Sequence, residues 1–275
     1  MTGASTINLH VCLGALALTA LVTGCASQSD DRAPTDVPTA PAAELSSELD
    51  HLHGLHIDPA GTVLAGTHTG LVAIDPSGGV ARVGDSDDDF MGLTGVPGSD
   101  TLFSSGHPGR SSSAPNPLGL RISTDGGRTW TDRSLVGEVD FHALATDGTV
   151  VVGFGGGKGL RISQDGGTGW VFGAAVRAVD LAVTDAGVWV LTPDGLQLST
   201  DTGQSVESVP EAPGMVLLAG ARDALWGVDE QGIAWRSRDG RAWQRHSYIG
   251  PVQALTAADY DTAYAASSRS LYTLG

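Results

Sequence analysis

Short runs of alternating apolar and polar residues fill the chain from residue 51 to its last residue. Glycine and aspartate turns separate these runs, and none of the runs shows the period of an amphipathic helix. Alternation with a period of two is typical of strands that bury one face in a core. The pattern therefore predicts one all-β domain over residues 44–275.

Six of the runs begin with a shared pattern: a variable residue, then glycine or alanine, then leucine. The copies are residues 53–55, 91–93, 142–144, 180–182, 216–218 and 253–255, the fourth and fifth with a small shift in residue type. Each copy is expected to start the innermost strand of a unit of about 37 residues. The sequence thus predicts an all-β fold, a β-propeller of four-stranded antiparallel blades, with six blades favoured and seven the main alternative.

The last of these units is too short to hold four strands, since it comprises only residues 252–275. A blade with a missing outer strand would leave an open sheet edge, and open edges promote aggregation. We therefore expect residues 44–50, which precede the first inner strand, to pair with the last unit and close the ring.

A second phrase repeats inside the same units. Residues 123–130 read Ser-Thr-Asp-Gly-Gly-Arg-Thr-Trp, residues 163–170 read Ser-Gln-Asp-Gly-Gly-Thr-Gly-Trp, and diverged copies start at residues 199 and 237. An aspartate in such a turn accepts hydrogen bonds from nearby backbone amides, glycine supplies a positive φ, and tryptophan covers the hairpin. The residues with these structural roles are Ser123, Asp125, Gly127, Trp130, Ser163, Asp165, Gly167, Trp170, Asp201, Asp239 and Trp243.

This phrase resembles the Asp-box, or BNR, repeat of sialidases, sortilin-type receptors and many bacterial propellers. Five further phrases are similar to those of small bacterial surface lipoproteins labelled glycosyl hydrolase-like: residues 51–55, 89–92, 105–109, 115–120 and 140–144. The resemblance implies a propeller on the cell exterior. It implies no reaction, because the same hairpins occur in enzymes and in binding proteins.

The charge of the chain excludes one class of partner. Lys and Arg total 15 against 31 Asp and Glu, which gives a net charge of −16 at pH 7. Such a surface repels nucleic acid and anionic lipid headgroups, and it favours cationic ligands and metal ions.

The first residues predict an exported lipoprotein. Residues 11–22 form an apolar segment too short to span a membrane, and small residues lead directly to Cys25. Residues 1–24 are thus predicted to be a signal peptide and Cys25 to carry a lipid, which anchors the protein to the bacterial cell membrane outside the cytoplasm. Residues 25–43, rich in Ser, Pro and Ala, are predicted to be a flexible tether. The other cysteine, Cys12, lies in the removed segment, so no disulfide is expected.

Five histidines are predicted to meet on one face of the wheel. In a propeller, the starts of inner strands and the ends of second strands share a face around the central channel. His51, His53 and His142 fall at inner-strand starts, whereas His68 and His107 fall at second-strand ends. The acidic residues Asp89, Asp140 and Asp180 and the thioether of Met91 occupy related positions at inner-strand starts. His56 and His246 are instead expected to be ordinary surface or turn residues.

This set of residues permits three interpretations. Imidazole groups suit a transition metal such as zinc or copper, and Met91 would favour copper unless it only packs in the core. Two of Asp89, Asp140 and Asp180 with a histidine would suit a glycoside hydrolase. Sialidase activity is not expected, since no arginine lies at an inner-strand start. In the third interpretation the polar residues only line a water-filled channel, and the wheel is a non-catalytic scaffold that binds a protein at its rim. The partner expected across these interpretations is a small molecule, a glycan or an envelope protein.

Overall fold

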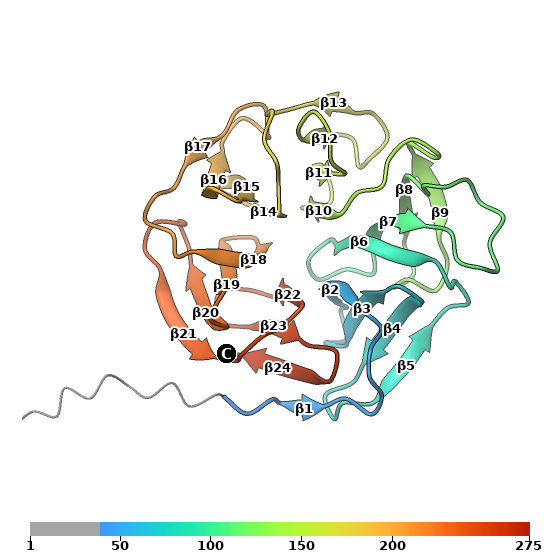
Figure 1. Cartoon of the computed structure of the whole chain (residues 1–275), viewed down its shortest axis with the longest axis horizontal. Coiled ribbons are helices and arrows are strands. Elements are labelled where there is room, and N and C mark those ends of the chain that lie inside the picture. The colour runs from blue at the N-terminus through green and yellow to red at the C-terminus, as the bar shows by residue number, and fades with distance from the viewer. Residues whose placement is uncertain (1–38) are drawn as a thin grey trace, which may run out of the picture. The chain divides into compact units, whose positions relative to one another are not determined.

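The computed structural model describes residues 39–275, which form a wheel of six four-stranded antiparallel sheets (Figure 1). The prediction of six blades is confirmed, and the alternative of seven is wrong. The signal peptide, the lipid on Cys25 and most of the predicted tether lie outside the described residues and stay predictions. In residues 39–275 no helix has the length and apolar character needed to cross a membrane.

Each blade runs from an inner strand beside the channel to an outer strand at the rim. Blade 1 comprises β2 (Leu52–Ile57), β3 (Val63–Thr67), β4 (Gly70–Ile74) and β5 (Val80–Val83). Blade 2 comprises β6 (Asp89–Gly95), β7 (Leu102–His107), β8 (Leu120–Ser123) and β9 (Thr131–Ser134). Blade 3 comprises β10 (Ala143–Thr146), β11 (Val151–Phe154), β12 (Arg161–Ser163) and β13 (Val171–Phe172).

The second half of the wheel repeats this order. Blade 4 comprises β14 (Asp180–Thr184), β15 (Gly187–Thr192), β16 (Gly195–Ser199) and β17 (Glu207–Ser208). Blade 5 comprises β18 (Met215–Ala221), β19 (Ala224–Asp229), β20 (Ile233–Ser237) and β21 (Gln244–Tyr248). Blade 6 comprises β22 (Ala254–Ala257), β23 (Ala263–Ala266), β24 (Ser270–Leu274) and β1 (Ala43–Glu44).

The ring closes through the first strand of the described chain, as the short last unit required. In β1, Ala43 pairs with Leu271 and Glu44 with Ser270 of β24. The strand starts one residue earlier than expected and is only two residues long, because the chain then turns toward blade 1. There the amide of Ser46 donates to the carbonyl of Gly78 at 2.8 Å, so the closing segment also joins blade 6 to blade 1.

The hydrophobic core is divided into six clusters, and each cluster fills the interface between two adjacent blades. Between blades 2 and 3, for example, Phe103, Phe141 and Leu144 pack together and are at most 7% exposed. The leucines of the repeated pattern, Leu55, Leu93, Leu144, Leu181, Leu218 and Leu255, enter one cluster each. The repeat in the sequence therefore encodes the contact of each inner strand with its neighbouring blade.

The glycine before Leu55 and the glycine before Leu93 allow the blades to approach. A Cβ added at Gly54 would lie 2.6 Å from the carbonyl oxygen of Leu93, and one added at Gly92 would lie 2.3 Å from that of Phe141. Both oxygens belong to the backbone of the next blade and have no room to move. Glycine is thus required at these two positions by close packing of adjacent blades.

The Asp-box turns connect the third and fourth strands of blades 2 to 5. In the turn of blade 2, the Ser123 hydroxyl donates to Asp125 at 2.8 Å and accepts from the amide of Gly127 at 2.8 Å. The other oxygen of Asp125 accepts from the Thr129 hydroxyl at 2.6 Å. The same serine-to-aspartate bond recurs at Asp165, Asp201 and Asp239. The indole N–H of Trp170 donates to Ser134 of the preceding blade at 2.8 Å, so the tryptophan ties two blades together.

These turns make the stability of the wheel sensitive to acid. The bonds from Thr129 and Ser123 lower the pKa of Asp125 to about 2 from its ordinary value of 3.8. Because the folded-state pKa is depressed, the stabilisation is complete above the unfolded value and is lost as the pH falls through about 2. We expect Asp125→Asn to lower the free energy of unfolding at neutral pH, with the difference from wild type vanishing toward pH 2.

Urea unfolding between pH 7 and pH 2 measures this difference. Asp85→Asn is the matched control, because Asp85 is exposed and has no hydrogen bond or ion pair among the described residues. A difference for Asp125→Asn that stays constant across the pH range would contradict the prediction.

Candidate metal centre

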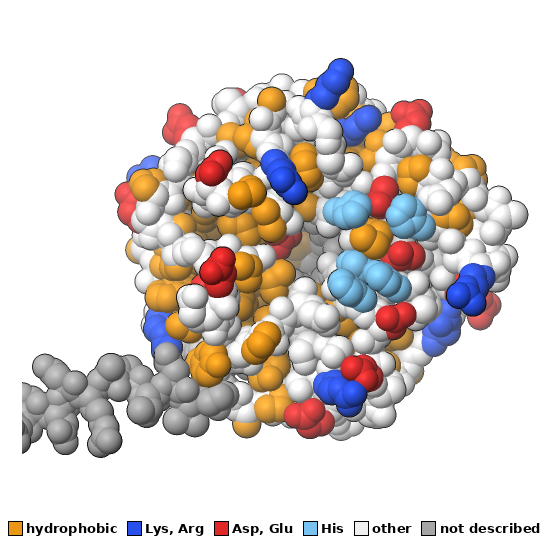
Figure 2. Space-filling model, in the orientation of Figure 1, with side chains coloured by type: hydrophobic (Ala, Val, Ile, Leu, Met, Phe, Trp, Pro, Cys, Tyr) orange, Lys and Arg blue, Asp and Glu red, His pale blue; other side chains and the backbone are white. Residues whose placement is uncertain are grey.

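The site lies at the mouth of the wheel, which we define as the face where the inner strands begin. Figure 2 shows the histidines gathered on one side of the central hollow, with acidic side chains between and beside them. They come from blades 1 to 3, as the alignment of strand starts and second-strand ends predicts. Their side chains form two groups.

The first group is the His triad, which consists of His51, His53 and His68. The three ring centroids lie 4.7 to 4.8 Å apart, and His68 stacks on both other rings. One nitrogen from each ring can be chosen so that all three lie within 4.8 Å of one another. The start of β2 and the turn from β3 to β4, both in blade 1, thus bring three imidazoles together.

The backbone around the triad departs from regular strand geometry. His51 adopts a φ of 45°, which lies in the left-handed region that residues other than glycine seldom occupy. The pairing of β2 with β3 then shifts register between Leu52 and Gly54, so that His53 sits in a bulge. A bulge redirects a side chain relative to a regular strand, and bulges are frequent next to functional sites.

His53 is the half-buried centre of the triad. Burial, joined by the neighbouring His68, His51 and His142 and opposed by Asp50, lowers its pKa to about 4 from 6.5. The ring is therefore neutral at pH 7 and keeps a free lone pair. Its Nε2 atom is buried and has no hydrogen-bond partner among the described residues.

The second group is the Asp140 group, which consists of His107, Asp140 and His142. The Nε2 atom of His142 lies 2.8 Å from one carboxylate oxygen of Asp140, and the Nε2 atom of His107 lies 3.2 Å from the same oxygen. The other oxygen of Asp140 is buried without a partner in the described chain. His107 and His142 are thus committed to a carboxylate, and they do not join the nitrogens of the triad in one ligand set.

Asp89 stands between the two groups. Burial raises the pKa of Asp89, while the charges of His68, His107 and His51 lower it and that of Asp140 raises it. Its Oδ1 atom is the third buried polar atom at the mouth that lacks a partner, and residues 39–275 contain six such side-chain atoms in total. Half of the unsatisfied buried polar atoms in the described chain therefore belong to this one face.

Asp180 does not share the environment of Asp89 and Asp140. Its carboxylate accepts the amide of Leu181 at 2.8 Å and the amide of Leu218 at 2.8 Å, so it joins the inner strands of blades 4 and 5. Burial raises its pKa to about 6, and these two amides oppose the shift. Met91 is half-buried in β6, where the pairing with β7 shifts register between Asp89 and Gly92.

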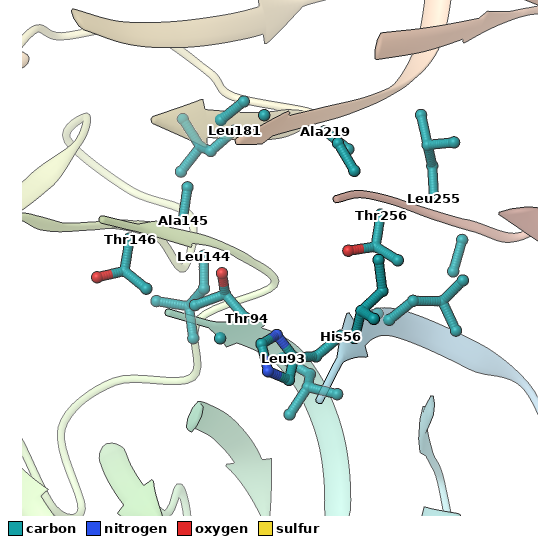
Figure 3. Close-up of a pocket in the computed structure, with 18 of the residues that line it drawn as sticks. His56, Leu93, Thr94, Leu144, Ala145, Thr146, Leu181, Ala219, Leu255 and Thr256 are labelled. Carbon is teal, nitrogen blue, oxygen red and sulfur yellow. The ribbon is translucent and has the colours of Figure 1, made fainter. Parts of the chain in front are cut away.

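The central channel below the mouth has a volume of about 410 Å³ and reaches from His53 and His142 to Pro59 and Gly98. Its walls come from all six inner strands and mix apolar with polar groups. Figure 3 shows Leu93, Leu144, Leu181 and Leu255 around this space, together with the polar side chains of Thr94, Thr146, Thr256 and His56. The clustered histidines with Asp89 and Asp140 lie at the mouth of this channel.

His56 and His246 differ from their expected surface positions. His56 is only 4% exposed, and its Nε2 atom lies 2.9 Å from the carbonyl of Ser99. His246 is half-buried, and its ring centroid lies 5.2 Å from that of Trp226. The expectation of ordinary surface residues is wrong for His56, since period-two alternation cannot say which side of a strand faces the channel.

Two features of the mouth were not anticipated from the sequence. His107 Nδ1 lies 2.7 Å from the side-chain oxygen of Asn116, which belongs to the long loop after β7. The base of that loop is held by Asp88, which accepts the amide of Gly109 at 2.9 Å and pairs with Arg121 at 2.5 Å. Asp88 is only 4% exposed, so one carboxylate of the acidic run before β6 is buried and paired with an arginine of β8.

Comparison with known proteins establishes the fold. No protein family and no curated protein sequence matches the chain. A GH74 xyloglucanase from Xanthomonas campestris superimposes with a TM-score of 0.51 at 20% identity, over 82% of this chain and 43% of that one. A protein of unknown function from Bacteroides thetaiotaomicron gives 0.55 at 10% identity, over 83% and 70%.

A third structure widens the range of roles among the neighbours. PorZ, a surface component of the type-IX secretion system of Porphyromonas gingivalis, gives a TM-score of 0.52 at 15% identity, over 82% of this chain and 37% of that one. This chain thus spans less than half the length of PorZ or of the xyloglucanase. At such identities the similarity shows the fold alone. The chain is a six-bladed β-propeller whose structural neighbours include a BNR-type glycoside hydrolase and a secretion component.

Proposed function

We propose that this propeller binds one transition metal ion, zinc or copper, at the His triad. The observation that carries the proposal is the convergence of three imidazole nitrogens within 4.8 Å. His53 also has a buried ring nitrogen, Nε2, without a partner among residues 39–275, and buried polar atoms ordinarily have one. A metal ion would satisfy this atom and the two rings stacked beside it.

The chemistry of the donor set fits such an ion. Imidazole is a preferred ligand of zinc and copper, and three nitrogens leave a fourth coordination position open to the mouth. Zinc–nitrogen bonds of about 2.0 to 2.1 Å in tetrahedral geometry require nitrogens about 3.3 Å apart. The rings therefore need to close by rotation of their side chains. The negative charge of Asp89, which acts on His68 and His51, would offset part of the charge of the cation.

Glycoside hydrolysis has less support in the geometry. Of the three carboxylates considered for it, Asp180 is occupied by two backbone amides and Asp140 by two histidines. Asp89 and Asp140 each keep one buried oxygen without a partner in the described chain. Because Asp140 and Asp180 are already engaged through their other contacts, no two of the three carboxylates are both free to serve as acid and base.

Titration of the purified, metal-free protein with Zn²⁺ and separately with Cu²⁺ tests the proposal. Isothermal calorimetry is expected to give one equivalent of ion per chain, and the bound protein is expected to melt at a higher temperature. Ligand binding at 100 times the dissociation constant adds about 2.7 kcal/mol to the free energy of unfolding. A protein that binds neither ion at micromolar concentration would rule the proposal out.

A further inference from the structure

A second cavity opens on the mouth face beside the Asp140 group. It has a volume of about 730 Å³ and is lined by His142, Phe154, residues 155–158 and residues 175–179. We call it the side cavity. The lining comes from the end of β11 and from the segment before β14, so the side cavity lies between blades 3 and 4. His142 also lines the central channel together with His53 of the His triad, so it borders both cavities.

The side cavity carries positive charge in a strongly acidic chain. Lys158 is the only lysine of a sequence with a net charge of −16, and Arg177 lines the same cavity. Within residues 39–275, neither side chain has a hydrogen bond, an ion pair or a ring contact. Arg121, Arg236, Arg238 and Arg269, by contrast, each pair with a carboxylate. Figure 2 shows basic side chains on this face over blade 3 and the start of blade 4, whereas acidic side chains lie beside the histidines.

Backbone donors add to the two cations. Gly156 and Gly157 adopt φ values of 81° and 87°, and a Cβ added at either would meet no atom within 4 Å. The amides of Gly156, Gly157 and Lys158 donate no hydrogen bond to other described residues. Successive free amides in a glycine turn with positive φ can form a concave site for an anion. The rest of the lining, Phe154, Val176 and Val179, is apolar and suits the carbon skeleton of an organic ligand.

We propose that the side cavity binds the carboxylate groups of a small organic acid through Lys158, Arg177 and the free amides of residues 156–158. Resting on the proposed function, we further infer that the metal ion reaches the His triad as the chelate of such an acid. An organic carboxylate matches both the cations and the apolar lining, whereas inorganic phosphate matches only the cations. The negative chelate would also be drawn to these two cations on a surface that otherwise repels it.

Citrate is the probe for this proposal, with inorganic phosphate as the comparison. Calorimetry with the metal-free full chain is expected to show binding of citrate, and weaker or no binding of phosphate. The variant Lys158→Met/Arg177→Met is expected to weaken citrate binding by at least about tenfold while Zn²⁺ alone binds as before. The single variant Lys158→Met serves if the double variant does not fold. The control Arg222→Met/Arg241→Met removes the same charge from two exposed arginines outside the cavity and is expected to bind citrate like wild type.

The outcomes separate this inference from the proposed function. The side-cavity proposal is overturned by any of three results, whether or not Zn²⁺ binds. Citrate does not bind to wild type, it binds the double variant equally well, or it binds no better than phosphate. Citrate binding without binding of either Zn²⁺ or Cu²⁺ keeps the side cavity and overturns the metal site. In equilibrium dialysis against equimolar Zn²⁺ and citrate, wild type is expected to retain more zinc than the double variant. Equal retention overturns the inference that the ion arrives as a chelate.

Discussion

Replacing His53 with alanine is expected to lower the affinity of the protein for Zn²⁺ or Cu²⁺ by more than about 100-fold, which exceeds the loss usual for a residue that only supports a ligand. His53 has the central place in the triad, because its ring lies 4.8 Å from that of His51 and 4.7 Å from that of His68. It also supplies the buried Nε2 atom that lacks a partner among the described residues. Calorimetric titration of the variant measures the change.

Two comparison variants make this result specific. His246→Gln removes an imidazole that packs against Trp226 and is expected to bind the ion like wild type. His107→Ala removes a histidine of the Asp140 group and is expected to weaken binding by less than about tenfold, since it contacts Asp140 and not the triad. If His107→Ala weakens binding as much as His53→Ala does, the ligand set is not the triad.

Removal of the closing strand is expected to have the largest effect on stability. A chain that begins at Ser47 lacks β1, which pairs with β24, and lacks the amide of Leu45 that donates to Arg269 at 2.8 Å. It also loses the bond from Ser46 to blade 1. At about 1 kcal/mol for each backbone hydrogen bond, the free energy of unfolding is expected to fall by roughly 3 kcal/mol or more.

The bare edge of β24 adds a second expected consequence, because unpaired edges recruit other chains. Sedimentation velocity is expected to show that the chain that begins at Ser47 associates with itself. This self-association is expected to increase with protein concentration. A chain that begins at Thr39 keeps β1 and is the control, expected to remain as stable and as monodisperse as the complete protein. Equal melting temperatures for the two truncated chains would show that β1 does not close the ring.

The fold was readable from the sequence because it repeats. Each blade reuses a leucine where its inner strand meets a neighbouring blade, and four of the six place glycine or alanine before it, so the repeated pattern predicted the six interfaces. The need for closure followed from the short last unit. The exact length of β1 could not be predicted in this way. Its end is set by the turn toward Gly78 of another blade, which no local sequence pattern encodes.

The site was only partly readable, and the reason is side-chain direction. Position in the repeat placed His51, His53, His68, His107 and His142 on one face. Their division into the triad and the Asp140 group depends on side-chain rotamers and on the bulge at His53, which spacing does not reveal. For the same reason Asp180, which looked equivalent to His142, turned out to bond the backbone of blade 5.

The pairing of β1 with β24 also constrains how the protein is made. Glu44 and Ser270 are separated by 226 positions, so the hydrogen bond between them joins almost the first and almost the last described residues. During synthesis, five blades emerge before the partner of β1 exists, and long-range pairing of this kind folds slowly. The finished ring is consequently a post-translational product, and a nascent chain halted before β24 would remain open.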